Sequence, residues 1–318
     1  MKIFNDFTVE SNADSSAVVI GSFDGVHIGH QELIRKAVDY ADAQRNAGLI
    51  AESVVILMPK LSKRVREHAY SSQLHASEFL LTVQERIDIM QRLSVDRVIV
   101  VENVEYRNVD YRDFVNDYLL DRLKMRKIFL TKYSKMGRGA RGNYKTLTKM
   151  VENETAPKFE VEKVDFQMLG DEIISSTLIK KLLTAGKILD ANTALGRKHF
   201  VKGLIVEGKK LGKKLGFPTA NFANIQEYLP KDGVYRGVFR VLDSTHALYN
   251  IPKPAVASLG TNYTFSAKSQ TFEVHVIGET GLELYGTNCM FEFEKFTREM
   301  RKFASKDDLI AQLNIDVL

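Results

Sequence analysis

Cysteine and long apolar runs are scarce in this sequence of 318 residues, and each scarcity excludes a class of protein. The single cysteine, Cys289, can form no internal disulfide and supplies no metal cluster. The apolar runs, such as residues 17–20 and 98–101, are far shorter than the roughly 20 residues that a membrane span needs. The N-terminus has no long apolar stretch with a basic flank, so no signal peptide is predicted. We expect a cytoplasmic protein with no membrane partner.

A strong excess of one charge is also missing. The formal net charge is +5, and much of it lies in two short runs, Lys209-Lys210 and Lys213-Lys214. A groove for single-stranded nucleic acid would place aromatic residues between such cations, and none stands there. We therefore expect a solvated loop that attracts phosphate groups, and no nucleic-acid partner.

The first half of the sequence alternates short apolar runs with segments of helical periodicity. Leu80, Val83, Ile87 and Met90, for example, recur at the spacing of one helix face. Strands that alternate with helices of this length favour a parallel sheet with helices on both faces, which is a doubly wound α/β domain. We predict strands near residues 17–20, 54–58, 97–101, 128–130 and 159–164, and helices near residues 30–45, 80–90, 114–119 and 176–184.

The pattern changes after residue 202, where glycines become frequent and the runs between them are β-branched and aromatic. Residues 234–241 and 271–276 are two such runs. Short strands separated by turn residues predict a small barrel or sandwich. The last segment, residues 305–315, predicts a closing helix with Ser305 as its N-cap. We expect two domains, residues 1–185 and residues 186–318.

The most informative segment is residues 21–30, which read GSFDGVHIGH between a predicted strand and a predicted helix. Gly21 and Gly25 allow a tight turn, and Gly29 allows a ligand to approach the helix N-terminus, where free N–H groups favour anions. His27 and His30 are three positions apart, so both imidazoles can face one phosphate. Hydrogen bonds donated there would stabilise charge that builds on a phosphate during in-line attack.

Other interpretations of this segment are weaker. A lone histidine on a helix is usually a core or surface residue, but this pair follows a strand and a glycine turn. Helices that bind zinc prefer histidines at i and i+4, and no third ligand lies nearby. A phosphate loop of the Gly-x-x-x-x-Gly-Lys-Ser/Thr kind is absent. The His-x-Gly-His pattern resembles the hallmark of the nucleotidyltransferase superfamily, and the whole segment is similar to its FMN adenylyltransferase branch.

A second segment extends this resemblance. Residues 174–180 read ISSTLIK and are similar to the family's Ile-Ser-Ser-Thr-x-Ile-Arg, whose hydroxyls and arginine contact the ATP triphosphate. A plain helix cap is the structural alternative, and one residue can serve both purposes. Lys180 lacks the planar fork of the family's arginine, so we expect a weaker contact. The resemblance implies catalytic roles for His27 and His30, and ATP binding by Gly21, Phe23, Asp24, Gly29, Ser175, Ser176, Thr177 and Lys180.

The flavin side of this domain departs from the family pattern. Residues 57–61 read LMPKL where the family has Phe-x-Pro-His-Pro. Residues 131–137 read TKYSKMG where the family has Gly-x-Asp-Phe-x-Phe-Gly. We expect a retained nucleotide side and a remodelled flavin side.

The second domain carries its own motif, because residues 203–221 read GLIVEGKKLGKKLGFPTAN. The repeated glycines can form a mobile loop whose amides cradle phosphates. Thr219 and Asn221 supply hard oxygen ligands of the kind that Mg²⁺ takes together with nucleotide phosphates and water. A turn capped by the asparagine is the structural alternative. The segment resembles the riboflavin kinase module nearly position by position, with Lys213 in place of the family's arginine.

The kinase resemblance implies further roles. Residues 273–275 read EVH and match the segment with the kinase's catalytic carboxylate, so Glu273 is expected to accept a proton from the ribityl 5′-hydroxyl of riboflavin. A glutamate on the outer face of a strand is the plain alternative. Arg298 is expected near the flavin. The implied metal ligands are Thr219 and Asn221, and the implied ATP-binding residues are Gly203, Gly208, Gly212, Lys213, Gly216, Phe217 and Pro218.

Three departures fall in this second domain. Ser258, Tyr263 and Met300 stand where the family has asparagine, proline and glutamate. We expect these changes to loosen the flavin pocket, whereas the phosphate, metal and base positions are kept.

Taken together, the motifs cover about residues 15–316, and the chain resembles the bacterial bifunctional riboflavin kinase/FMN adenylyltransferases. The resemblance implies phosphorylation of riboflavin to FMN and adenylylation of FMN to FAD, with ATP and Mg²⁺. Two alternatives stay open. One is a riboflavin kinase whose first domain binds a nucleotide but is weak or inactive, and the other is a non-catalytic flavin- or nucleotide-binding paralogue. The retained base at Glu273 disfavours the second.

Overall fold

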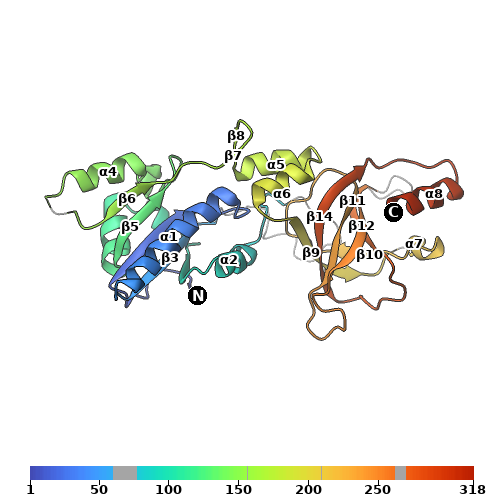
Figure 1. Cartoon of the computed structure of the whole chain (residues 1–318), viewed down its shortest axis with the longest axis horizontal. Helices are drawn as coiled ribbons and strands as arrows, with labels where there is room; N and C mark the ends of the chain where they lie inside the picture. The colour runs from blue at the N-terminus through green and yellow to red at the C-terminus, as the bar shows by residue number, and fades with distance from the viewer. Residues whose placement is uncertain (60–76, 156, 209, 262–269) are drawn as a thin grey trace. The chain divides into compact units, whose positions relative to one another are not determined.

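The computed structural model describes residues 1–59, 77–155, 157–208, 210–261 and 270–318 of the chain. They form two compact units, coloured by residue number in Figure 1. The first unit holds Met1–Leu61 and Val83–Ser175, and the second holds Ser176–Leu318 together with residues 62–82. Of the positions compared above, Lys60, Leu61, Lys209 and Tyr263 lie outside the described residues.

The predicted domain boundary falls in a turn between two helices of the second unit. Residues 185 and 186 lie between α5 (Ser176–Thr184) and α6 (Ile188–Leu195). The two compact units separate earlier, between Ser175 and Ser176. As a domain boundary, the division at residues 185/186 stays a prediction.

The first unit is built on a six-stranded sheet in the order β1-β4-β3-β2-β5-β6. Every neighbouring pair in it is parallel, and parallel strands need crossover connections such as the helices between them. The strands are β1 (Lys2–Phe4), β2 (Ser15–Gly21), β3 (Ala51–Leu57), β4 (Arg97–Val100), β5 (Met125–Leu130) and β6 (Glu160–Lys163).

Helices cover both faces of this sheet, so the predicted doubly wound α/β arrangement is confirmed. On one face, helix α1 (Ile28–Asn46) contacts β2, β3 and β5. On the other face, η2 (Phe114–Arg122) and α4 (Tyr144–Glu152) pack on the sheet in an apolar cluster that contains no residue of α1. The described helices of this unit are α1 (Ile28–Asn46), α2 (Val83–Arg92), η1 (Val104–Asn108), α3 (Tyr111–Asp113), η2 (Phe114–Arg122), η3 (Arg138–Ala140) and α4 (Tyr144–Glu152). A short hairpin of β7 (Met168–Leu169) and β8 (Glu172–Ile173) follows β6.

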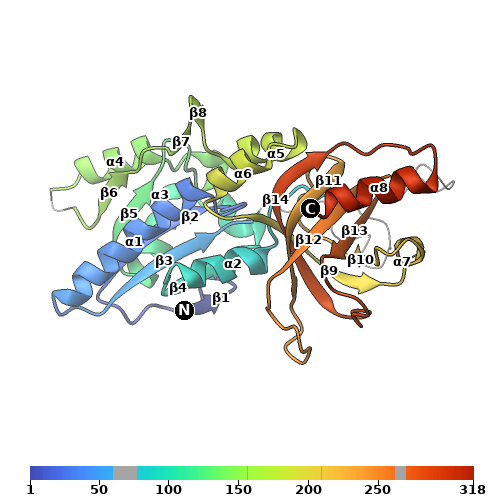
Figure 2. The same ribbon diagram turned by 45° about the vertical axis from the view of Figure 1, so that its right-hand side comes forward.

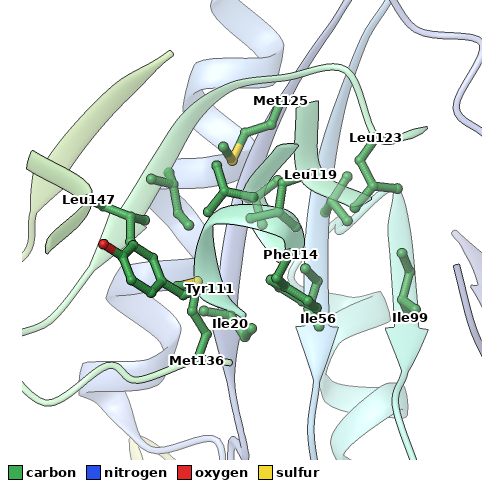
Figure 3. Close-up of a cluster of buried hydrophobic side chains, with 14 of the residues drawn as sticks. Ile20, Ile56, Ile99, Tyr111, Phe114, Leu119, Leu123, Met125, Met136 and Leu147 are labelled. Atoms are coloured by element: carbon green, nitrogen blue, oxygen red, sulfur yellow. The ribbon is translucent and has the colours of Figure 1, made fainter. Parts of the chain in front are cut away.

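A single apolar cluster fills the space between the sheet and η2. Ile20, Ile56 and Ile99 extend from three neighbouring strands toward Phe114 and Leu119 (Figure 3). These side chains are at most 3% exposed. Full burial of a side chain of this size contributes about 1.5–3 kcal/mol. This cluster therefore fixes β2, whose carboxyl end carries the first motif, between its neighbours in the sheet.

The second unit contains a closed antiparallel barrel in the order β10-β13-β12-β11-β14-β9, and β9 pairs with β10 to complete it (Figure 2). Of the two predicted architectures, barrel or sandwich, the barrel is confirmed. Ser305 caps the closing helix α8 (Lys306–Asp316) by accepting a hydrogen bond from the Asp308 amide at 3.1 Å, as predicted. The strands are β9 (His199–Val206), β10 (Ala220–Ala223), β11 (Gly233–Val241), β12 (Lys253–Thr261), β13 (Gln270–Val276) and β14 (Asn288–Arg298), and α7 (Leu211–Lys214) lies between β9 and β10.

Aromatic side chains fill the barrel interior. Phe291 meets Phe293 and Phe272 edge to face, with ring centroids 5.0 and 5.6 Å apart. Tyr235 packs on Phe293 in the same way at 5.1 Å. Edge-to-face pairs add about 0.5–1.5 kcal/mol beyond their buried area. Cys289 is also buried in the barrel, and burial raises the pKa of its thiol to about 12, so it is chemically unreactive.

Within the described part of the chain, no helix combines the length and the apolar composition required to cross a membrane. The same residues contain no group of three or more His, Cys, Asp or Glu side chains placed to hold a metal ion.

Candidate active sites

The loop that follows β2 has an unusual backbone at two positions. Phe23 has a φ of 48° and Val26 a φ of 38°, in the left-handed region that β-branched residues rarely adopt. The Val26 amide donates to the Phe23 carbonyl at 3.0 Å, and the Gln31 side chain donates to the Val26 carbonyl at 2.8 Å. Such backbone strain costs about 1–3 kcal/mol per residue and is often found at functional sites.

A buried arginine holds the same loop from helix α2. Arg86 Nη1 donates to the Ser22 carbonyl at 3.0 Å, and Nη2 lies 3.4 Å from Asp24 Oδ1. The side chains of Arg86 and Asp24 are only 2% and 9% exposed. Breaking a buried ion pair by removing one partner costs about 3–5 kcal/mol. Asp24, predicted to bind ATP, thus has a clear role in fixing the loop.

The two predicted catalytic histidines lie against each other at the start of α1. Their rings stack with centroids 3.7 Å apart and an angle of 19° between the planes. His27 is the N-cap of α1, and its Nδ1 accepts a hydrogen bond from the His30 amide at 3.4 Å. A Cβ at Gly29 would lie 3.3 Å from His27 Nδ1, so the glycine leaves room for this ring. The two imidazoles thus lie together, and the expectation that both face one phosphate stays a prediction.

His30 is uncharged at neutral pH. Burial lowers its pKa well below the usual histidine range, and the neighbouring His27 and Arg86 lower it further. Its Nδ1 atom is buried and has no hydrogen-bond partner among the described residues. An unsatisfied buried polar atom costs about 1–3 kcal/mol, a cost that a bound ligand would remove. The ring lies in the first turn of α1, where free N–H groups favour an anion such as a nucleotide phosphate.

The predicted triphosphate-binding segment is divided between the two compact units. Ser175 is the last residue of the first unit, whereas Ser176, Thr177 and Lys180 lie on α5 of the second. Lys180 donates to the Glu78 carbonyl and lies over the Phe79 and Tyr228 rings, 5.8 and 6.0 Å from their centroids. The joining of this segment with the histidine loop in one ATP site stays a prediction.

The remodelled segment after β5 forms a tight turn that presents an aromatic side chain. The Thr131 amide donates to Ser134 Oγ at 3.0 Å, and the Ser134 amide donates to the Thr131 carbonyl at 3.1 Å. Tyr133 is 60% exposed and stacks on Phe166, with centroids 5.0 Å apart. Nothing in the local sequence indicates this pair, because Phe166 lies 33 positions away in the loop after β6, and the neighbourhood of β5 and β6 in the sheet is not visible in the local pattern.

Three of the predicted kinase residues lie together where β10 pairs with β13. The Thr219 hydroxyl donates to Glu273 Oε2 at 3.0 Å. In the pairing of β10 with β13, Asn221 lies directly opposite Glu273, and Ser258 of β12 lies opposite Glu273 on its other side. Thr219, Asn221 and Glu273 thus bring a hydroxyl, an amide oxygen and a carboxylate together. This hard-oxygen set fits Mg²⁺.

Two of the predicted loop glycines leave room for neighbouring atoms of the same loop and of Asn221. A Cβ at Gly208 would come within 2.3 Å of Asn221 Nδ2. A Cβ at Gly212 would come within 2.3 Å of the Phe217 carbonyl oxygen, and the Phe217 amide donates to the Gly212 carbonyl at 2.9 Å. Gly216 has a φ of 86°, which only glycine adopts without strain.

The expectation that Gly203 belongs to this mobile loop is wrong. Gly203 lies inside β9 and pairs with Cys289 of β14. A Cβ there would come within 2.8 Å of the Ala223 carbonyl oxygen, so the glycine serves the approach of two strands. Lys213 is exposed on α7, as a phosphate-attracting residue would be. ATP binding by these loop residues and by Pro218 stays a prediction.

Arg298 makes a strong contact that the sequence did not predict. Its Nε and Nη2 donate to the two carboxylate oxygens of Asp316 at 2.9 and 2.6 Å, and the Asp316 side chain is 1% exposed. This two-bond fork ties β14 to α8. Met300 lies near Gly260, where an added Cβ would meet its Cγ at 3.1 Å. The expected place of Arg298 near a flavin stays a prediction.

Comparison with protein families gives two matches along the chain. A family model described as FAD synthetase matches residues 9–178. A family model described as riboflavin kinase matches residues 195–318. The first match contains the histidine loop and the second contains the barrel.

Comparison with individual proteins gives relatives along almost the whole chain. Proteins named bifunctional riboflavin kinase/FMN adenylyltransferase from Listeria monocytogenes and Escherichia coli K12 are 30% and 27% identical. The alignments cover 95% and 96% of this chain and 90% and 91% of those relatives. A solved structure titled macrolide-efflux protein from Streptococcus pneumoniae superposes with a TM-score of 0.80 and 26% identity, over 99% of this chain and 96% of that one.

Proposed function

Because this chain belongs to the family of bifunctional riboflavin kinase/FMN adenylyltransferases, we propose which of its residues act in each of two reactions. The enzyme phosphorylates riboflavin with ATP to FMN and ADP, and adenylylates FMN with ATP to FAD and pyrophosphate. It uses Mg²⁺ with the nucleotide. This dual activity is favoured over the kinase-only and the non-catalytic alternatives, since both family models match.

Phosphoryl transfer is assigned to the cluster of Thr219, Asn221 and Glu273. Glu273 accepts the proton of the ribityl 5′-hydroxyl while that oxygen forms a bond to the γ-phosphorus of ATP and the bond to ADP breaks. Thr219 and Asn221 would hold Mg²⁺, which offsets the negative charge of the phosphates when bound. The observation that supports this assignment most is the 3.0 Å hydrogen bond between Thr219 and Glu273.

Adenylyl transfer is assigned to the histidine loop. A phosphate oxygen of FMN forms a bond to the α-phosphorus of ATP, and pyrophosphate leaves. His27 and His30 donate hydrogen bonds to the oxygens on which charge builds. A neutral His30 with a buried, unpartnered ring nitrogen supports this role, because such a group is already desolvated before the nucleotide arrives.

The flavin ring of FMN is assigned to the Tyr133–Phe166 pair. Strand β5 neighbours both β2 and β6, and all three are parallel, so the loops after their carboxyl ends lie at one edge of the sheet. Ligands of open α/β sheets bind at that edge. The exposed face of Tyr133 offers a planar surface for a planar ring system.

The cellular setting is proposed on composition. A single cysteine, buried in the barrel, suits a reducing cytoplasm. The modest net charge of +5 and the lack of aromatics between the lysine runs support small-molecule flavin and nucleotide partners rather than nucleic acid or membrane.

The test is direct. Purified protein is incubated with MgATP and riboflavin, and separately with MgATP and FMN, and the flavins are separated by chromatography. We expect FMN from the first mixture and FAD from both. Failure to form FMN would remove the kinase assignment, and failure to form FAD from FMN would leave only the kinase.

A further inference from the structure

A histidine with no role so far lies beside the kinase cluster. His275 stands two positions after Glu273 on β13, so both side chains leave the strand on the same face. Its Nδ1 atom lies 2.8 Å from the Pro218 carbonyl oxygen. A carbonyl oxygen can only accept, so Nδ1 carries the hydrogen and donates it. The hydrogen bond therefore fixes which ring nitrogen is protonated.

The ring is held on a second side as well. Phe217 packs edge to face on His275, with ring centroids 5.4 Å apart and an angle of 67° between the planes. His275 thus contacts two consecutive residues, Phe217 through its ring and Pro218 through its carbonyl. Both come directly before Thr219 in the chain.

The bonded carbonyl belongs to the peptide plane that leads into Thr219. A trans peptide is rigid, so the direction of the Pro218 carbonyl sets the direction of the Thr219 amide and Cα. Proline fixes its own φ, which leaves little other freedom at this point. The Thr219 hydroxyl then reaches Glu273 at 3.0 Å. Strand β13 therefore holds the Pro218–Thr219 turn at two points, one through His275 and one through Glu273.

We propose that His275 is a positioning residue for phosphoryl transfer: its Nδ1–H holds the Pro218–Thr219 peptide so that the Thr219 hydroxyl faces Glu273 and Mg²⁺. This inference rests on the proposed kinase site. His275 touches neither the reacting atoms nor the metal in this role, and it acts through Thr219. Loss of the His275 hydrogen bond should therefore raise the Mg²⁺ concentration needed for half-maximal rate and also lower kcat.

The experiment compares two variants that differ in one group. His275→Asn keeps an N–H donor close to the position of Nδ1, whereas His275→Leu keeps bulk and loses the donor. For His275→Leu we expect kcat for FMN formation to fall about three- to tenfold, the usual effect of one hydrogen bond. The Mg²⁺ concentration for half-maximal rate should rise by a similar factor, and KM for riboflavin should stay unchanged. His275→Asn should recover most of both losses.

A matched control is His199, whose Nε2 lies 2.8 Å from the Tyr228 carbonyl oxygen. His199 is the first residue of β9, and Val206, at the other end of that strand, lies opposite Asn221. Roughly 20 Å of strand therefore separate His199 from the kinase cluster. His199→Leu should lower Tm but leave the Mg²⁺ requirement unchanged.

Several results would overturn the proposal. They are an unchanged Mg²⁺ requirement in His275→Leu, a loss in His275→Asn equal to that in His275→Leu, or the same Mg²⁺ effect in His199→Leu. Should His275→Leu not fold, His275→Asn and His275→Gln decide, because only the shorter amide places its donor at Nδ1. The kinase assignment is tested apart from this, since wild-type protein must form FMN whatever His275 does.

Discussion

Asn221 and Glu273 stand directly opposite each other in the antiparallel pairing of β10 with β13. Side chains in such positions have Cβ atoms about 4.5–5.5 Å apart on the same face. The proposed oxygen ligand Asn221 and the carboxylate of Glu273 are thereby held by backbone hydrogen bonds of a closed barrel rather than by a loop. This rigidity allows substitutions at the site to be interpreted as changes of chemistry.

Glu273→Gln removes the proposed base and keeps the shape of the side chain. We expect FMN formation from riboflavin to fall at least about 100-fold, because a positioned base typically contributes that much or more. FAD formation from FMN should be unchanged. Glu279→Gln is the control, since Glu279 pairs with Lys253 just beyond β13. Steady-state kinetics on separated flavins measures both rates, and a Glu273→Gln rate within fivefold of wild type would contradict the assignment.

Gly208→Ala tests the packing around the metal ligand. The added methyl group would lie 2.3 Å from Asn221 Nδ2, so the asparagine must move. We expect the Mg²⁺ concentration for half-maximal kinase rate to rise about tenfold. Gly278→Ala introduces an alanine at a φ of 78° with open space around it, and it should cost stability only. An equal effect of both variants on the Mg²⁺ requirement would show that Gly208 acts through the backbone alone.

His30→Ala tests the role of the histidine loop in adenylyl transfer. Loss of one preorganised donor typically lowers kcat about 100- to 1,000-fold, and we expect that loss in FAD formation from FMN. FMN formation from riboflavin serves as an internal control, because the kinase residues lie in the barrel. The prediction is wrong if both activities fall together in a protein with wild-type Tm.

His30 also predicts how stability changes with pH. Burial lowers its pKa in the folded protein below the ordinary value of 6.5, so the unfolded chain takes up the proton first as the pH falls. Above about pH 6.5 both states carry a neutral ring, and His30 adds no pH dependence. Below that value it lowers the free energy of unfolding by up to about 1.4 kcal/mol per pH unit. Between pH 8 and pH 5, Tm should fall more steeply below pH 6.5 in wild type than in His30→Gln.

Tyr133→Ala tests the proposed flavin surface. Loss of one aromatic stacking partner is worth about 0.5–1.5 kcal/mol, so KM for FMN in FAD formation should rise about two- to tenfold. KM for ATP and the kinase reaction should stay unchanged. Tyr249→Ala removes a similarly exposed tyrosine from the second unit and is the control. An unchanged KM for FMN would leave adenylyl transfer standing and place the flavin elsewhere.

The regular elements could largely be predicted from the sequence, because the strands coincide with short apolar runs and the helices with apolar residues at helical spacing. All five predicted strands of the sheet are present, and so is the helix capped by Ser305. Strand β1 was missed since it has only three residues and little burial, which leaves no pattern to detect. The helix predicted near residues 114–119 is present, but as a π-helix, a distinction that apolar spacing does not make.

The parts of the sites that depend on distant partners could not be predicted. Arg86 and Asp24 are 62 positions apart, and nothing in the segment around either residue indicates the other. At Gly203 the sequence predicted a role that the structure does not show. In the sequence it looks like a member of the glycine loop, but its freedom from a Cβ serves the contact of β9 with β10. A motif therefore indicates which residue types form a site. The structural reason for each type depends on its contacts with residues that are distant in the sequence.

Strands β9 and β10 are hydrogen-bonded neighbours with Val206 opposite Asn221, so the glycine loop leaves the barrel and returns to the same place. The entropy of closing such a loop grows only slowly with its length. Residues inserted into the loop between Gly212 and Gly216 should therefore leave intact the strand pairing that holds Asn221 and Glu273, provided that Gly208 and Gly212 are kept.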